Sequence, residues 1–198
     1  MTQFTAKKFD IPALKGISAK TIAEHLKLYE GYVKNANGIL DMLGKYSSDS
    51  VGNAYIMGEL ARRFSFEYNG MRNHEIYFSS FEGGAKALPA GSAFKKAIEE
   101  MCSFDAWLGG FKGLAMTRGI GWAVLWYDPK DKRLLANWVD EQHLGQLNGC
   151  QMILALDMWE HSYVADYQPS GKKQYVEDFF ANLNWKVIED NYKKATAK

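Results

Sequence analysis

The pattern of apolar positions predicts two long amphipathic helices in the first half of the chain. Apolar residues recur every three or four positions over residues 18–46, and Ser18 is a suitable N-cap. After the polar, turn-like residues 47–50, a second helical pattern covers residues 60–78, with a break or bend expected near Gly70. We therefore expect an antiparallel helical hairpin.

The second half of the chain mixes helical and strand-like patterns. Residues 81–91 are rich in glycine, proline and small side chains, and they separate the hairpin from the sequence that follows. Beyond them we expect two helices, three strands and a closing helix, at residues 93–101, 104–117, 122–127, 134–139, 151–156 and 175–194.

The predicted fold class is therefore α+β. An N-terminal antiparallel helical hairpin domain would cover residues 1–85. A C-terminal domain, residues 90–198, would contain a three-stranded antiparallel sheet flanked by helices.

Composition and charge exclude several classes of partner. The chain is 47% hydrophobic and 24% charged, as folded proteins are, and its formal net charge of +1 favours neither nucleic acid nor an anionic membrane. No run of 18 apolar residues could span a bilayer, and no secretory signal opens the chain. Cys102 and Cys150 lack metal-binding spacing, so we expect free thiols in a cytoplasmic protein.

Candidate chemistry begins with the histidines, of which the chain has only four. His25 and His74 lie on the two expected hairpin helices, so each helix could present one imidazole to a shared point, as metal sites in helical bundles do. Taken singly, a histidine on such a helix is more often a hydrogen-bonded core residue than a metal ligand.

A carboxylate at the end of the third predicted strand strengthens the case for a metal. Burying Asp157 is costly unless a positive charge compensates it, and His161, four residues later, can approach the same point. A metal cation would supply that charge. The alternative is that Asp157 caps a helix and that His161 is a surface residue.

The sequence around these two residues resembles a known family. Residues 157–163, DMWEHSY, resemble the D-x-W-E-H-A-Y signature of the iron/manganese superoxide dismutases. Further similarity to this family lies in residues 17–25, Asn73-His74, Gly119-Ile120-Gly121-Trp122, Asp166-Tyr167 and Asn184-Trp185.

The resemblance implies an enzyme that disproportionates superoxide, its small-molecule substrate, to dioxygen and hydrogen peroxide. One iron or manganese ion per subunit would be alternately reduced and oxidised. By this resemblance its ligands are His25, His74, Asp157 and His161. Three imidazoles and a carboxylate suit iron or manganese and leave a position for solvent, but they do not choose between the two metals.

Two further residues are expected to act beside the metal. His143 lies where the family places a glutamine or histidine that contacts the bound solvent, and Gly70, four residues before His74, would leave room for it. Tyr32 resembles the family's gateway tyrosine, which passes protons. It follows His25 by seven residues, whereas relatives have a spacing of eight.

Other positions depart from the family pattern or concern self-association. Tyr29 stands where a histidine is usual, and Val164 replaces the second tyrosine of H-A-Y-Y, so the proton relay is expected to differ. By resemblance, Glu160 would bond to His161 of the partner subunit, which implies a homodimer or a dimer of dimers.

Two alternative functions stay open. The first is another mononuclear iron or manganese redox enzyme, such as an oxidase or peroxidase, which the changes at Tyr29 and Val164 favour. The second is a non-catalytic metal-binding or scaffold protein that keeps the fold.

Overall fold

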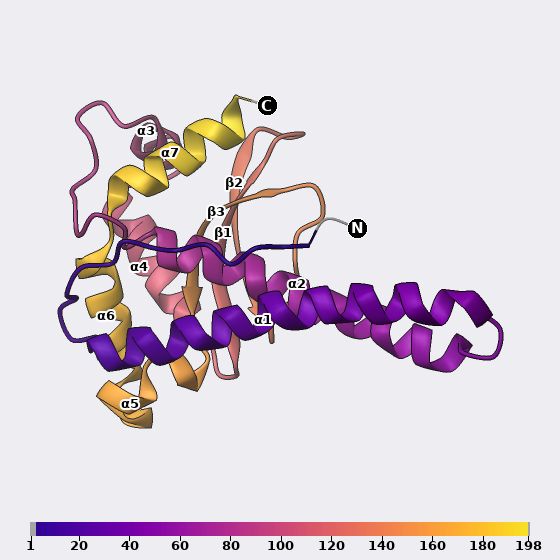
Figure 1. The fold of residues 1–198 in the computed structure, drawn as a ribbon. Coiled ribbons are helices and arrows are strands. Elements are labelled where there is room, and N and C mark those ends of the chain that lie inside the picture. The colour runs from indigo at the N-terminus through magenta and orange to yellow at the C-terminus, as the bar shows by residue number, and fades with distance from the viewer. Residues whose placement is uncertain (1–2, 198) are drawn as a thin grey trace.

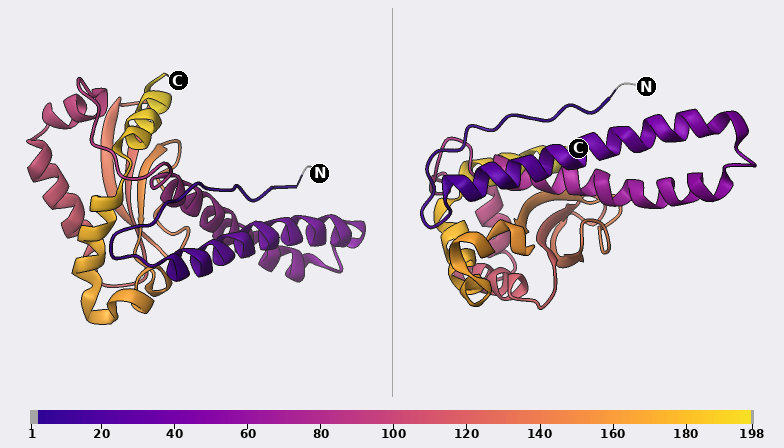
Figure 2. Two further views of the ribbon diagram at one scale, coloured as in Figure 1. Left: turned by 60° about the vertical axis from the view of Figure 1, so that its left-hand side comes forward. Right: turned by 60° about the horizontal axis from the view of Figure 1, so that its bottom comes forward.

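The N-terminal half of the chain forms the predicted helical hairpin. The structure is a computed structural model that describes residues 3–197 (Figure 1). Helix α1 (Ala19–Tyr46) and helix α2 (Ala54–Ser79) are joined through the short helix η1 (Ser47–Asp49), and the Ser18 side chain caps α1 by accepting a hydrogen bond from the Thr21 amide. The outer part of the hairpin extends beyond the rest of the molecule (Figure 2).

Helix α2 is continuous, so the predicted break near Gly70 is wrong. Gly70 serves a close approach between helices instead: a Cβ atom at this position would lie 2.6 Å from the Tyr32 ring on α1. A single glycine costs a helix only about 1 kcal/mol relative to alanine. Packing against α1 and the C-terminal half of the chain outweighs this cost.

The predicted three-stranded antiparallel sheet is confirmed. Its strands β1 (Gly121–Asp128), β2 (Arg133–Asp140) and β3 (Gln151–Asp157) lie in the order β2-β1-β3. The central strand β1 is buried along almost its whole length. In its register Trp122 lies opposite Val139 on one side and Asp157 on the other, which brings the end of β3 beside a large aromatic ring.

Helices surround this sheet (Figures 1 and 2). They are α3 (Ala93–Glu99), α4 (Phe104–Ala115), η2 (Glu160–Ser162), α5 (Val164–Tyr167), η3 (Pro169–Gly171), α6 (Lys172–Asn182) and α7 (Trp185–Thr196). Helices α2 and α7 both pack against β3. Among residues 3–197, no helix is long and apolar enough to cross a membrane.

The single closing helix predicted at residues 175–194 is wrong, because the chain breaks between α6 and α7. Leu183 is extended, and its carbonyl accepts a hydrogen bond from the Lys86 amide. The Asn184 side chain accepts from the Lys186 amide and donates to the Glu82 carbonyl. These hydrogen bonds hold the residues between α6 and α7 against residues 82–86, in the segment that links the hairpin to the sheet.

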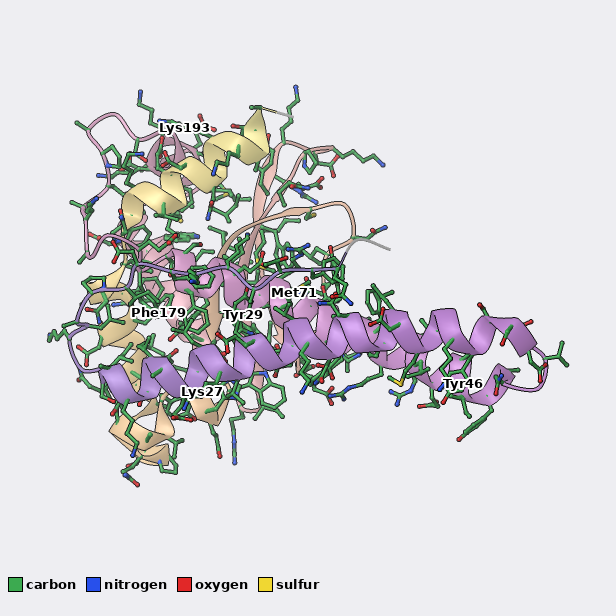
Figure 3. All side chains as sticks on the ribbon, in the orientation of Figure 1. Lys27, Tyr29, Tyr46, Met71, Phe179 and Lys193 are labelled. Atoms are coloured by element: carbon green, nitrogen blue, oxygen red, sulfur yellow. The ribbon has the colours of Figure 1, made fainter. Side chains whose placement is uncertain are left out.

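The hairpin and the sheet share one aromatic core. Tyr77 of α2 stacks on Phe179 of α6 at 5.7 Å between ring centroids and meets Trp122 of β1 edge-on at 6.3 Å. Figure 3 labels Phe179 among these side chains, together with Tyr29 and Met71, which are also fully buried. The division into domains of residues 1–85 and 90–198 stays a prediction.

Candidate metal centre

The structure brings together the four residues predicted as metal ligands. His25 comes from α1, His74 from α2, Asp157 from the end of β3 and His161 from η2, and their ligand atoms all lie within 4.8 Å of one another. Asp157 Oδ2 is 3.0 Å from His25 Nε2, 3.2 Å from His161 Nε2 and 3.5 Å from His74 Nε2. The site therefore lies where the hairpin meets the sheet.

Local hydrogen bonds hold the Asp157 carboxylate in this position. Its Oδ1 accepts from the Trp159 amide at 2.8 Å, which turns the chain at the end of β3 and leaves Oδ2 to face the histidines. The Asp157 carbonyl accepts from the hydroxyls of Tyr175, at 2.9 Å, and Ser162, at 3.1 Å. The same turn brings His161 back toward the carboxylate.

The protonation states leave a buried negative charge. Burial acts to raise the pKa of Asp157, but the imidazoles of His161 and His25 hold it well below its usual range. Burial also lowers the pKa of His25, and burial together with the neighbouring His25 lowers the pKa of His74 to about 3. At neutral pH the ionised carboxylate thus faces the neutral, buried imidazoles of His25 and His74, which are in the form that binds metal.

The orientation of His74 also fits a metal ligand. Its Nδ1 donates a hydrogen bond to the Gly70 carbonyl, at 2.6 Å, which fixes the tautomer because a carbonyl can only accept. The other nitrogen, Nε2, is buried without a hydrogen-bond partner among the described residues. A buried lone pair facing a carboxylate is what a cation at this position would satisfy.

Aromatic rings enclose the four candidate ligands. Trp122 meets His74 edge-on at 4.9 Å, Trp159 stacks on His161 at 5.7 Å, and Tyr77 and Phe78 lie about as close to His25. This wall lowers the local dielectric and strengthens charge interactions inside the site. The side chains of three ligands are fully buried, whereas His161 is 22% exposed.

Tyr32 lies beside the ligands and is linked to a residue that was not expected in the site. Its ring packs against His74 at 5.0 Å, and its hydroxyl accepts a hydrogen bond from Gln142 Nε2 at 3.0 Å. Gln142 is fully buried, and its Oε1 accepts from Trp122 Nε1 at 2.9 Å. The sequence feature that could have identified Gln142 as a site residue is its position next to His143, just after the second strand.

His143 lies at the edge of this group. Its ring meets Phe66 edge-on at 5.7 Å, and its Nδ1 is 4.0 Å from the Glu141 carboxylate. Within the described part of the chain, no hydrogen bond joins His143 to Tyr32 or to the four ligands. The space beside Gly70 is occupied by the Tyr32 ring, so the expectation that Gly70 leaves room for His143 is wrong.

The two departures from the family pattern lie on different elements, Tyr29 on α1 and Val164 on α5. Tyr29 is fully buried, accepts a hydrogen bond from the Lys7 amide at 2.8 Å and donates to Glu75, so its hydroxyl faces the N-terminal segment. Val164 begins α5 and is partly buried. Glu160, next to His161, is exposed.

Comparison with known proteins agrees with this geometry. Residues 89–191 match the family model for iron/manganese superoxide dismutases, C-terminal domain. A protein named superoxide dismutase [Fe] from Aquifex pyrophilus is 33% identical over 187 residues, which cover 92% of this chain and 87% of the relative.

Relatives named for each of the two metals match to a similar degree. A superoxide dismutase [Fe] from Cupriavidus metallidurans is 35% identical over 87% of this chain and 86% of its own. A superoxide dismutase [Mn] from Haloarcula marismortui is 30% identical over 96% of this chain and 92% of its own.

The geometry predicts that metal binding depends on the charge of Asp157. An Asp157→Asn variant keeps the shape of the side chain but removes the buried negative charge, so iron or manganese affinity should fall at least 100-fold. Elemental analysis after dialysis against a graded series of chelator concentrations measures this. Asp105→Asn, on the exposed first turn of α4, is the matched control. Equal metal retention by both variants would contradict the assignment.

Proposed function

Because the chain belongs to the iron/manganese superoxide dismutases, an oxidoreductase family, we propose that it converts superoxide to dioxygen and hydrogen peroxide. One iron or manganese ion would be held by His25, His74, Asp157 and His161. The observation that carries the proposal is the meeting of these four donors, from four separate elements, within 4.8 Å. Imidazole and carboxylate donors without thiolates suit iron or manganese.

The bound ion would supply one-electron chemistry by accepting an electron from one superoxide and returning it to the next. The chain's own groups prepare the site for an anion. A metal-bound imidazole carries no charge and Asp157 contributes a single negative charge, so these four side chains would only partly neutralise a trivalent or divalent ion. The surrounding aromatic rings exclude water and preserve this attraction.

Tyr32 and Gln142 are the groups that we propose to hold and deliver protons. Gln142 Nε2 donates to the Tyr32 oxygen, so the phenolic hydrogen is free to be donated inside the site. Burial raises the pKa of Tyr32, which keeps the proton in place at neutral pH. In this proposal Gln142 takes the role that the sequence suggested for His143.

We further propose a homodimer, or a dimer of dimers, in which Glu160 bonds to His161 of the partner subunit. Two features support this: Glu160 is exposed, and His161 is the one candidate ligand of the four that is partly exposed. The cytoplasm is the proposed location, since both Cys102 and Cys150 are free thiols.

One observation favours a second function. The Tyr29 hydroxyl is bound to Lys7 and Glu75, so it supplies no proton on the Tyr32 side of the ligands. A slower proton supply would favour a related oxidase or peroxidase, or a metal-binding protein with little turnover. Product analysis with dioxygen or peroxide as substrate distinguishes these from a dismutase.

The proposal predicts fast dismutation by the metal-loaded protein. Metal-free protein should be reconstituted separately with iron and with manganese, and superoxide decay followed by stopped-flow absorbance. At least one form should be active, and the Asp157→Asn variant treated in parallel should lose at least 99% of that activity, because it cannot hold the ion. Equal rates in the variant and the parent would refute the proposal.

The contacts of Tyr32 predict a difference between two neighbouring residues. Gln142→Leu removes both hydrogen bonds and should lower the dismutation rate at least tenfold, in the range typical of lost proton-transfer groups. His143→Leu should cost clearly less, because its ring contacts Phe66 at the edge of the site. A larger loss in the His143 variant would restore the sequence-based assignment.

A further inference from the structure

An arginine lies beside the opening of the metal centre. The ligands are closed off except near His161, where Trp159 stacks on the exposed imidazole. Phe66 contacts the Trp159 ring edge-on at 6.4 Å and the Tyr32 ring at 6.0 Å. Phe66 therefore joins Trp159, the neighbour of the partly exposed His161, to Tyr32, the proposed proton donor. The guanidinium of Arg63 lies across its face, 3.6 Å from the ring centroid.

Two contacts fix this guanidinium. Besides the Phe66 ring, Arg63 Nε donates to Glu67 Oε1 at 2.8 Å, and the other carboxylate oxygen of Glu67 accepts from Asn35 at 3.3 Å. A stacked, ion-paired arginine is held in one orientation, which a lysine at this position could not reproduce. In the described contacts only Nε of Arg63 is used, so both terminal NH₂ groups are available to an anion.

In the Arg63–Glu67 ion pair, the positive group faces solvent and the negative group is buried. The Glu67 side chain is 6% exposed, whereas that of Arg63 is 49% exposed, so an approaching anion meets the positive end first. Both charges also affect the Tyr32 hydroxyl. Burial and the Asp157 charge are the larger causes of its raised pKa; Glu67 also raises this pKa and Arg63 lowers it. The pair thus acts electrostatically on the side of the site where Tyr32 lies.

We propose that Arg63, positioned by Phe66 and Glu67, is an anion-guiding residue that draws superoxide toward the opening of the metal centre. The proposal rests on the proposed dismutase function but concerns a step before the chemistry. A fixed charge at an opening raises the local concentration of an anionic substrate, and added salt screens its effect. Such a residue should affect the capture of small anions more than turnover at saturation.

The experiment measures azide binding to the metal-loaded protein by the optical spectrum of the metal. Arg63→Met keeps most of the aliphatic contact with Phe66 but removes the charge. At an ionic strength of about 0.01 M, where the screening length is roughly 30 Å, it should weaken azide binding about three- to tenfold. Near 1 M salt, where this length is about 3 Å, the difference should disappear. Glu67→Gln should tighten azide binding, because it removes the opposing charge.

Arg133→Met is the matched control. It removes the same charge from the start of β2, which pairs with the end of β1 away from Trp122 and the ligands. Azide affinity should stay within twofold of the parent. Equal effects of the Arg63 and Arg133 variants, or an effect of Arg63→Met that salt does not change, would overturn the proposal.

Steady-state kinetics separates this proposal from the proposed function. In an active dismutase, Arg63→Met should lower kcat/KM by about the same factor as azide affinity and leave kcat unchanged. If every form lacks dismutation but the azide pattern holds, the proposed function fails and the guiding role stands. Full activity with unchanged azide binding in Arg63→Met would overturn the guiding role alone.

Discussion

The structure depends on one buried negative charge. Asp157 lies at the point where hairpin and sheet meet, its carboxylate is inaccessible to solvent, and burial lowers the pKa of the His25 and His74 imidazoles beside it. An unpaired buried charge is among the costliest features a fold can carry, and hydrogen bonds compensate it only in part. A metal cation held by His25, His74, Asp157 and His161 would offset this cost, so metal affinity and the docking of hairpin and sheet would have a common origin.

The fold explains how four distant residues reach this point. His25 and His74 come from antiparallel helices that approach closely at Gly70, while Asp157 and His161 come from one strand end and its turn. The aromatic core shared by the two halves holds these elements in register. Metal binding should therefore stabilise the docking of hairpin and sheet as well as create the reactive centre.

Much of this arrangement follows from the sequence alone. The periodicity of α1 and the apolar runs of the strands predicted the hairpin and the sheet. The set of His25, His74, Asp157 and His161 came from the resemblance of residues 157–163 and of the two helices to a known family. The predicted break at Gly70 failed because the glycine accommodates the Tyr32 ring from another helix. The single closing helix failed because Asn184 is held by contacts with the distant linker at Glu82. Both errors concern contacts between residues far apart in the chain, which local patterns do not contain.

The sequence pointed to His143 and missed Gln142 for a different reason. The chain passes through a left-handed conformation at Glu141, with φ of +50°, and directly after it Gln142 is buried between Trp122 and Tyr32. The sequence shows two adjacent polar residues but not that dihedral angle.

The central claim, that His25, His74, Asp157 and His161 bind one metal ion, is tested most directly by X-ray absorption spectroscopy of the reconstituted protein at the iron or manganese edge. The account predicts three imidazole rings and a carboxylate oxygen around a single ion, whereas fewer imidazoles, or a spectrum unchanged in Asp157→Asn, would contradict it.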